Sequence, residues 1–505
     1  MLRIFGTRRK LCDGLTRRDL LHVGGLGAFG VGLSDLLRLQ QAVASRQAGG
    51  VDAASSPGFG KAKACVLLYL YGSPAQHETF DPKPDAPTEI QGEMQAVSTS
   101  VPGLRIGEGL PEVAQVMDRV TLVRSMTHPY PLHGTVYAMT GIPKVDTKIE
   151  FRVRDPRQWP FIGSIVDYLG HQSSSGAMPE VPRNISLPYL LHSKANYHPL
   201  AGPYATFLGN AYDPVWTEFN GQGVKVVPNL GGESGSSIHF YDPNGQVDPQ
   251  ERLRLSHAGR LADGVSTRRM EMRRLLLEQF DAARRRIDGG RIDTYSRQQA
   301  QAYSLLTSQK VHKSLDVQAE PEEFRQLYGM TLFGQATLAA RRLIEAGCQF
   351  VTVFWDAWKY NNGAWDTHYY HYPRLKHVLL PGFDKAYSAL ILDLEARGLL
   401  DETLVLCFSE HGRTPKITNT PGGGREHWSR AYWSLLAGGG IARGRTVGKT
   451  DRIAGDVLST PVSPKDILAT AFHQLGIDPD TTIPDQIGRH WPIAGDGRLR
   501  RELLG

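Results

Sequence analysis

The sequence predicts an α/β protein, a three-layer αβα sandwich around a mainly parallel central sheet. Apolar runs of strand length begin at Ala64, Arg119, Cys348 and Thr403, and a helical pattern separates the last two. Helices between strands imply parallel crossovers. The last two runs end in clusters of Asp, Glu and His, which is where open α/β sheets place their ligand sites.

The length and charge of the chain narrow its class. A chain of 505 residues can form one large α/β domain with insertions, or two domains. The formal net charge is +6, but residues 1–44 hold seven Lys/Arg and three Asp/Glu and so contribute +4 of it. The basic segment 268–286 has the pattern of a solvated amphipathic helix. We therefore expect no nucleic-acid partner.

The N-terminus has the pattern of an export signal. Arg17 and Arg18 precede a weakly apolar, Gly-rich stretch at 20–33, and Ala42-Val43-Ala44 offers a cleavage site of small residues. The sequence predicts a twin-arginine signal over 1–44 and a mature chain in the periplasm or outside the cell. The apolar stretch is too short for a dedicated transmembrane helix, so we expect none in the mature chain.

The first strand is predicted over 64–71, after a loose linker at 45–60. Its apolar run is continuous, as in strands buried on both faces of a parallel sheet. The run stops at Gly72-Ser73-Pro74, and His77 and Glu78 follow it. These two side chains are candidates for binding substrate or metal at the strand tip. The alternative is a proline-rich surface loop with ordinary solvated charges.

The next strand, at 119–124, leads into a loop rich in hydroxyl and imidazole groups. Ser125, His133 and Thr135 lie in this loop, ahead of Thr140-Gly141. We expect the loop to begin a helix whose N-terminal amides bind an anion. The three side chains are therefore candidates for catalytic roles.

The alternation of strands and helices fades from 143 to 317. Loop-rich, proline-containing stretches come first, and a mainly helical pattern follows at 253–315. We interpret the whole range as an insertion or cap over the sheet edge. Its aromatic residues are interpreted as packing residues, with a substrate cleft as the alternative: Tyr204, Phe207, Tyr212 and Trp216.

The alternation returns in the C-terminal third of the chain. Helices are predicted over 322–346 and 372–397, on either side of a strand. A last helix over 464–476 has Pro in its first turn and Gly at its close. We place the α/β domain at 61–490 and a C-terminal tail at 491–505.

Acidic and imidazole residues at the tips of the C-terminal strands form the candidate site: Asp366, His368, His371, Glu410, His411, Glu426 and His427. Carboxylates and imidazoles from separate strand ends are the ligands expected for zinc, with calcium or manganese as the alternatives. Two neighbouring divalent ions can bind a phosphoryl or sulfuryl oxygen and activate a hydroxyl or water. Arg413, as a catalytic group, and Arg425, as a substrate-binding group, are candidates for holding the remaining anionic oxygens.

The motifs around these residues resemble those of a known family. They are WDTH at 365–368, SEHGRTP at 409–415, GREHW at 424–428 and LLAGGG at 435–440, with TFDPKPDAP at 79–87 and the segment 124–141 upstream. They resemble the exported bacterial family catalogued as domain of unknown function 1501. That family is similar to the alkaline phosphatase and sulfatase superfamily, which implies an αβα sheet and usually two metal ions.

The resemblance implies metal ligands at five positions of this chain. Asp366 and His368 resemble the Asp/His pair of one ion site. Glu410 and His411 resemble the acidic-His pair of the enzymes, and His427 resembles their last His ligand. Two departures concern these residues: Glu410 stands where the enzymes have Asp, and the spacing from Asp366 to its His is shorter than usual.

Two further departures concern the rest of the site. Gly72-Ser73 stands at the first strand tip, where an Asp ligand is common in the superfamily. The position of the superfamily's Ser, Thr or Cys nucleophile is Pro131 here, with His133 close by. Ser125, Thr127 and Thr135 are candidate substitutes.

The sequence thus favours an exported metal-dependent hydrolase of phosphate or sulfate esters. Its substrate would be an anionic ester, such as a sulfated or phosphorylated polysaccharide. The alternative is a catalytically degenerate superfamily member that binds an anionic glycan or an envelope partner. A further alternative is another enzyme on the same scaffold, such as a phosphomutase or transferase.

Overall fold

The computed structural model describes residues 57–130, 132–174, 178–195, 199–225, 241–256, 292–359 and 363–505. The predicted signal at 1–44, most of the predicted linker and the predicted helix at 268–286 lie outside these ranges. The described residues belong to one compact unit, Pro57–Gly505. Among the helices within the described ranges, none combines the length and apolar character needed to cross a bilayer.

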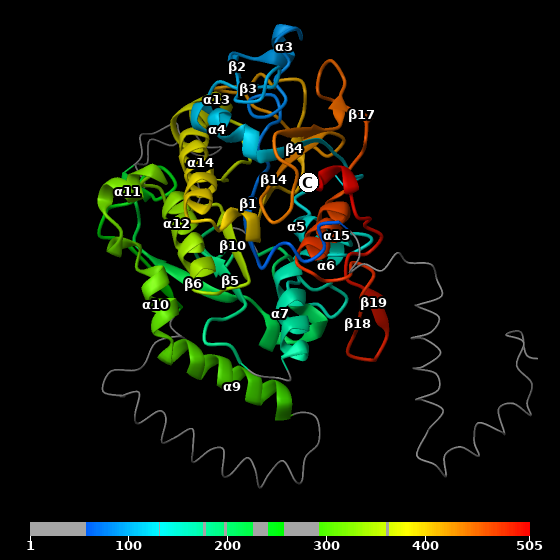
Figure 1. Ribbon diagram of the computed structural model, residues 1–505. Coiled ribbons are helices and arrows are strands. Elements are labelled where there is room, and N and C mark those ends of the chain that lie inside the picture. The colour runs from blue at the N-terminus through cyan, green and yellow to red at the C-terminus, as the bar shows by residue number, and fades with distance from the viewer. Residues whose placement is uncertain are drawn as a thin grey trace, which may run out of the picture. The chain divides into compact units, whose positions relative to one another are not determined.

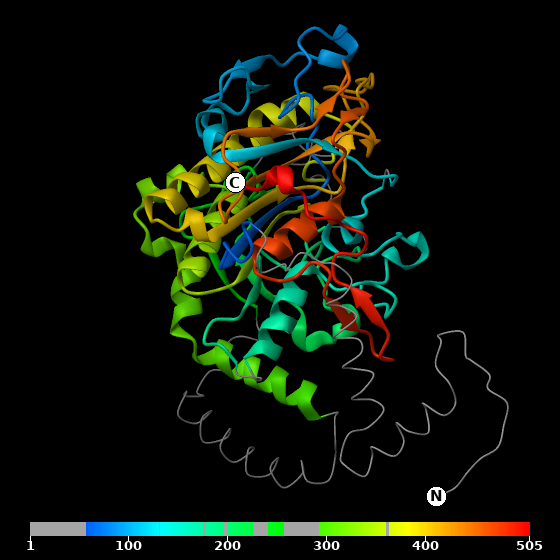
Figure 2. The same ribbon diagram turned by 45° about the vertical axis from the view of Figure 1, so that its right-hand side comes forward.

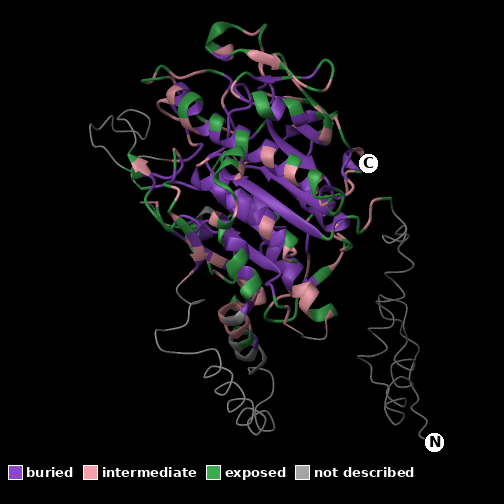
Figure 3. Ribbon diagram, turned by 60° about the vertical axis from the view of Figure 1, so that its left-hand side comes forward, coloured by how far each residue is buried: buried purple, intermediate pink, exposed green. Residues whose placement is uncertain are grey.

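A nine-stranded sheet forms the centre of the described structure, in the order β15-β4-β14-β11-β1-β10-β5-β6-β9 (Figure 1). Its strands are β1 (Ala64–Leu70), β4 (Val120–Met126), β5 (Asn184–Leu187), β6 (Val215–Asn220), β9 (Arg252–Leu255), β10 (Phe350–Trp355), β11 (Thr403–Phe408), β14 (Tyr432–Ala437) and β15 (Arg445–Val447). Every residue of β1, β10, β11 and β14 is buried, as Figure 3 shows in purple, because helices cover both faces of the sheet.

The directions of the strands decide which loops meet. Strands β11, β1, β10, β5 and β6 are parallel neighbours. Strand β14 is antiparallel to both β11 and β4, so β4 runs in the same direction as β11. The carboxyl ends of β1, β4, β10 and β11 therefore lie at one edge of the sheet, together with the amino end of β14.

Helices form a layer on each side of the sheet, so the predicted three-layer αβα architecture is confirmed. One layer contains α4 (Pro111–Val116), α12 (Leu332–Glu345) and α14 (Leu380–Ala396), and the other contains α5 (Thr135–Met139), α7 (Ile162–Ser173) and α15 (Pro464–Gln474). Figures 1 and 2 show the two layers on opposite sides of the strands.

The other elements surround this core. They are the helices α3 (Thr88–Gln91), α6 (Thr147–Glu150), α9 (Ile292–Thr307), α10 (Gln309–Leu315), α11 (Glu322–Leu327) and α13 (His371–Arg374), and the paired strands β2 (Ala96–Ser98) with β3 (Arg105–Gly107), β7 (Val224–Lys225) with β8 (Tyr241–Asp242), β12 (Gly412–Arg413) with β13 (His427–Trp428), β16 (Lys449–Thr450) with β17 (Val457–Ser459), and β18 (Thr482–Pro484) with β19 (His490–Pro492).

The predicted C-terminal helices form, with one break. Helix α15 matches its prediction, because Ser463 and Asp466 cap its first turn reciprocally. The predicted helix 322–346 is instead two helices, α11 and α12. Gly329 adopts a φ of +82° between them, and the Thr331 side chain caps the second.

The range 143–317 is not a cap separate from the sheet, and this prediction is corrected. Strands β5, β6 and β9 come from it and extend the central sheet beyond β10. Polar or charged residues interrupt the apolar ones in these strands, so they lack the continuous apolar runs of β10 and β11. The packing interpretation of the aromatics is supported: Tyr204 and Phe207 are buried, and Trp216 stacks on Phe354.

The predicted tail at 491–505 is also part of the folded unit. Strand β19 pairs with β18, Leu503 is fully buried, and Leu504 forms a β-bridge with Ile441. Charged residues around these few apolar ones concealed their burial in the sequence.

We predict that truncation of Leu406, at the centre of β11, destabilises the fold that carries the site. Leu406 is fully buried, so Leu406→Ala should lower the free energy of unfolding by about 2–5 kcal/mol. The same change at Leu392, which is 47% exposed on α14, should cost under about 0.5 kcal/mol. Urea unfolding followed by circular dichroism measures both, and equal losses would contradict the described packing.

Candidate metal centre

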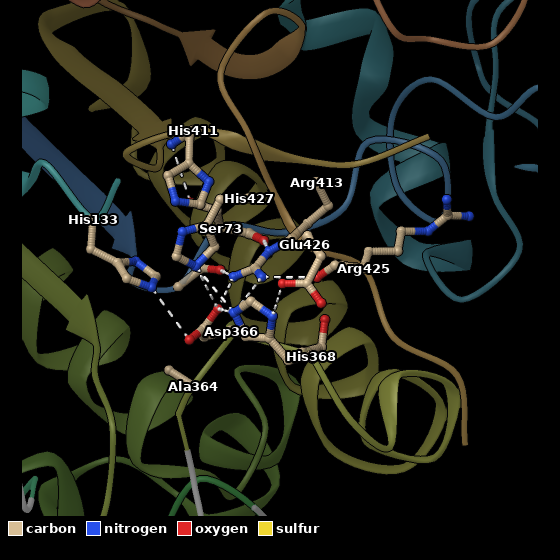
Figure 4. A network of polar contacts seen from close by, with 12 residues as sticks. Ser73, His133, Ala364, Asp366, His368, His411, Arg413, Arg425, Glu426 and His427 are labelled. Atoms are coloured by element: carbon tan, nitrogen blue, oxygen red, sulfur yellow. Dashed lines mark hydrogen bonds and ion pairs between the residues drawn. The ribbon is translucent and has the colours of Figure 1, made fainter. Parts of the chain in front are cut away.

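Four segments at strand ends bring acidic and imidazole groups together at the shared edge of the sheet (Figure 4). His133 follows β4, Asp366 and His368 follow β10, Glu410 and His411 follow β11, and His427 precedes β14. The side chains of Asp366, His133, His368 and His427 keep 18–24% of their surface exposed. The group is therefore largely buried but open to solvent.

Asp366, His368 and His427 have the spacing of ligands around one small cation. The Asp366 Oδ1 atom lies 2.9 Å from His368 Nε2 and 3.3 Å from His427 Nε2, and the two nitrogens are 3.1 Å apart. Tetrahedral zinc, with bonds of about 2.0–2.1 Å, places neighbouring ligand atoms roughly 3.3 Å apart. These three groups therefore fit a zinc ion.

A second group of possible ligands adjoins the first. His133, His411 and His427 offer nitrogen atoms that all lie within 4.8 Å of one another. His133 Nε2 also lies 3.3 Å from Asp366 Oδ2, the carboxylate oxygen that the first group leaves free. Asp366 thus faces both groups, as a carboxylate shared by two ions would.

Three of the imidazoles contact an oxygen atom through Nδ1. His368 Nδ1 contacts Glu426 Oε2 at 2.6 Å, His133 Nδ1 contacts Glu410 Oε1 at 2.8 Å, and His411 Nδ1 contacts the Gly412 carbonyl at 2.7 Å. When Nδ1 donates to such an acceptor, Nε2 keeps its lone pair for a metal. His411 Nε2 is buried and has no hydrogen-bond partner among the described residues.

The charges of the group also suit a cation. Burial would raise the pKa of Asp366, but Arg413 and three imidazoles hold it well below its usual range. Burial lowers the pKa of His411 and of His427, with the neighbouring cationic groups acting in the same direction. His133 differs, because Asp366 and Glu410 outweigh burial and raise its pKa to about 9, so a metal at its Nε2 would have to displace a proton.

Glu410 lies behind His133 rather than within either group of possible ligands. Its Oε1 atom accepts hydrogen bonds from the Gly72 amide at 2.8 Å and from His133. The side chain is fully buried. In this geometry Glu410 orients His133 and ties it to the tip of β1.

The two arginines point into the protein. Arg413 donates to the carbonyls of Ser73, Gly72 and Arg425 and to Asp366. Arg425 extends away from the group in Figure 4 and pairs with Glu78. Both arginines are 0% exposed. Their donors are thus directed to protein oxygens, apart from Arg413 Nη1, which also lies 3.4 Å from His368 Nε2.

The other predicted substrate-binding residues are likewise enclosed. Glu78 is 1% exposed and His77 is 4% exposed, with His77 Nε2 2.8 Å from the Ile453 carbonyl. The structure therefore does not bring the proposed substrate contacts of His77, Glu78 and Arg425 to the open edge.

The candidate nucleophiles Ser125 and Thr135 are both enclosed. Ser125 lies within β4, and its hydroxyl donates to the Thr460 carbonyl at 2.5 Å. Thr135 begins α5, and its side chain is fully buried. Pro131 lies outside the described residues. His133 is therefore the predicted catalytic residue of this loop that reaches the site.

Sequence reasoning placed Glu426 in the candidate site without a role, and it missed one further feature. Asp356 and His192 form a buried pair nearby, in which Asp356 accepts the His192 amide at 2.6 Å and burial raises the pKa of Asp356 to about 7. Tyr71 separates His192 from His133, at ring distances of 4.6 and 5.2 Å. An Asp directly after a buried strand was the available signal for this pair.

Comparison with solved structures finds distant likenesses. The PsFucS1 sulfatase from Pseudoalteromonas sp. shares 11% identity, over 87% of this chain and 72% of that one, with a TM-score of 0.36. The phosphonate monoester hydrolase SpPMH from Silicibacter pomeroyi shares 12%, over 87% and 76%, with a TM-score of 0.31. The lipoteichoic acid synthase LtaP from Listeria monocytogenes shares 9%, over 83% and 74%, with a TM-score of 0.33. Likenesses this low carry no information about the activity of this chain.

Among proteins with curated descriptions, none matches the chain. A family model, described as "Protein of unknown function (DUF1501)", matches residues 62–504. This range includes every strand of the central sheet and every residue of the candidate metal centre. The chain therefore belongs to the DUF1501 family, as its motifs indicated.

Proposed function

We propose that this protein is an exported, metal-dependent hydrolase of phosphate or sulfate esters. The observation that carries the proposal is the group of Asp366, His368 and His427, whose nitrogen and oxygen atoms have the spacing of zinc ligands, with a second group of imidazoles beside it. Their partial exposure supports access by an anionic ester. We propose zinc as the metal, with calcium or manganese as the alternatives, and a sulfated or phosphorylated polysaccharide as a possible substrate class.

A divalent ion in this site would polarise an ester oxygen and lower the pKa of a bound water. The chain itself would orient the ligands. Glu426 fixes the ring of His368, and Glu410 fixes the ring of His133. Arg413 neutralises part of the charge of Asp366 and holds that carboxylate in place. Because the two motif arginines are enclosed, the anionic oxygens of a substrate would be bound mainly by the metal.

A second candidate function is binding of an anionic glycan or envelope partner without turnover. The observation that favours it is the enclosure of the Ser125 and Thr135 hydroxyls, which shields these two candidate nucleophiles from solvent. Metal-loaded protein that binds a sulfated glycan saturably but hydrolyses neither aryl phosphates nor aryl sulfates would favour this candidate.

We predict that His427→Ala lowers zinc affinity by about tenfold or more, because His427 contributes to both ligand groups. Elemental analysis of the folded protein and zinc titration measure the change, and hydrolysis of an aryl phosphate or sulfate should fall with it. His377→Ala, at an exposed histidine, is the matched control and should behave as wild type. Wild-type protein that binds no divalent metal in metal-replete medium would refute the proposal.

Glu426→Gln tests the orientation of His368 separately. It weakens the contact with His368 Nδ1 but leaves every candidate ligand in place, so zinc affinity should fall by roughly 10–100-fold. The Glu426 side chain is 52% exposed, so stability should change little. Glu93→Gln, at a carboxylate 53% exposed, is the control for loss of a surface charge. Unchanged affinity in Glu426→Gln would contradict this role.

Export through the twin-arginine route is tested at the paired arginines. Replacing Arg17 and Arg18 by Lys should retain the protein in the cytoplasm, since the paired arginines are the proposed signal. Cell fractionation and immunoblotting measure the distribution. The same double change at Arg8 and Arg9 is the matched control and should leave export intact. Equal export of both variants would contradict the signal.

A further inference from the structure

A buried network of charged and polar side chains joins the loops that carry the candidate metal ligands. Glu78 comes from the loop after β1, and Arg425 directly precedes Glu426 and His427. His371 begins α13, three residues after His368. None of the three network side chains exceeds 1% exposure.

Arg425 and Glu78 form the centre of the network. Arg425 Nε lies 3.0 Å from Glu78 Oε2, and Arg425 Nη2 lies 2.5 Å from Glu78 Oε1, so the contact is bidentate. The remaining guanidinium donors reach the carbonyls of Ile90, Thr414 and Pro415. Because so many hydrogen bonds hold the planar guanidinium of Arg425, it has one orientation. This orientation also fixes the backbone beside His427.

His371 connects this pair to the loop between Asp366 and His368. Its Nε2 lies 3.1 Å from Glu78 Oε2, and its Nδ1 lies 2.7 Å from the hydroxyl of Thr367. The Thr367 carbonyl in turn accepts the Arg425 amide at 3.2 Å. The contacts therefore close a ring through Thr367, His371, Glu78 and Arg425.

Stability alone is a weak explanation for this network. Burial would raise the pKa of Glu78, but Arg425 and His371 hold it well below its usual range, so the carboxylate stays charged inside the protein. Taking two charges out of water costs about as much as their attraction returns, and apolar residues of the same volume often serve stability equally well. A bidentate ion pair does, however, fix the relative position of its two side chains more strictly than packed apolar groups do.

We propose that Glu78, Arg425, His371 and Thr367 are positioning residues of the metal centre, which set the distance between the Asp366–His368 loop and His427. The metal itself rests on the proposed function. This role replaces the substrate contact expected for Glu78 and Arg425. If these residues had only a structural role, replacing them would lower the stability of the whole fold. If they have a positioning role, replacing them changes first the affinity for the metal and its coordination geometry.

The experiment titrates Co²⁺ into four full-length variants and follows its visible absorption spectrum, which reports coordination geometry. Glu78→Gln removes the charge of the network, and Thr367→Val removes one hydroxyl with little change of shape. Asp167→Asn is matched to the first, because Asp167 is a buried carboxylate paired with Arg297 at 2.7 Å. Thr337→Val is matched to the second, because Thr337 is buried on α12 and donates to the Phe333 carbonyl.

We expect Glu78→Gln and Thr367→Val to lose about tenfold or more in Co²⁺ affinity and to change the spectrum, while both controls keep the wild-type values. If Glu78→Gln does not fold, Thr367→Val alone decides. Wild-type affinity and spectrum in Thr367→Val, or equal losses in the controls, would overturn the proposal and leave the metal centre standing. Wild-type protein that binds no Co²⁺ or Zn²⁺ would overturn the proposed function itself, and the positioning role with it.

Discussion

The reversed direction of β14 is the constraint on which the candidate site depends. Strands β4, β10 and β11 run in the same direction. The residues that follow them therefore all lie at the carboxyl edge of the sheet. His427 comes before its strand, and it reaches the same edge only because β14 runs antiparallel to β11 and β4. Strand polarity thus places groups that are distant in sequence within ligand distance of one another.

The charged residues of the site divide into those that face solvent and those that face the protein. Asp366, His368 and His427 belong to the first class. Arg413 and Arg425 belong to the second, with their donors directed to carbonyls and carboxylates. The cations that look most suitable for an anionic substrate are therefore used to hold the loops in place. Such an arrangement makes the centre rigid before any ion binds, which lowers the cost of binding.

The sequence allowed prediction of those parts whose pattern is local. The continuous apolar runs of β1 and β11 and the cap of α15 are examples. The convergence of Asp366 with His411 followed from the general geometry of open sheets, whereas His427 was expected there from its resemblance to the last His ligand of the superfamily. Strands β5, β6 and β9 escaped prediction because polar or charged residues interrupt their apolar runs and loops surround them. Pairing with neighbouring strands stabilises each of them.

The inward orientation of Arg413 and Arg425 was not predictable in the same way. A buried arginine has the same local sequence pattern as an exposed one, and its acceptors here come from remote segments of the chain. The role of Glu426 depends on the approach of His368, fifty-eight positions away. Tertiary contacts decide the roles of these side chains, and the periodic patterns of a single sequence do not reveal tertiary contacts.

The glycine at the tip of β1 limits how this centre can change over evolutionary time. Gly72 has a φ of +91°, and a Cβ atom there would lie 2.3 Å from the backbone nitrogen of Asp366. Any side chain at this position would push the Asp366 loop outward and separate the possible ligands. A carboxylate cannot therefore be gained at residue 72 by one substitution, and lineages that share this close approach of the two loops must supply the ligands of the centre from the other strand ends.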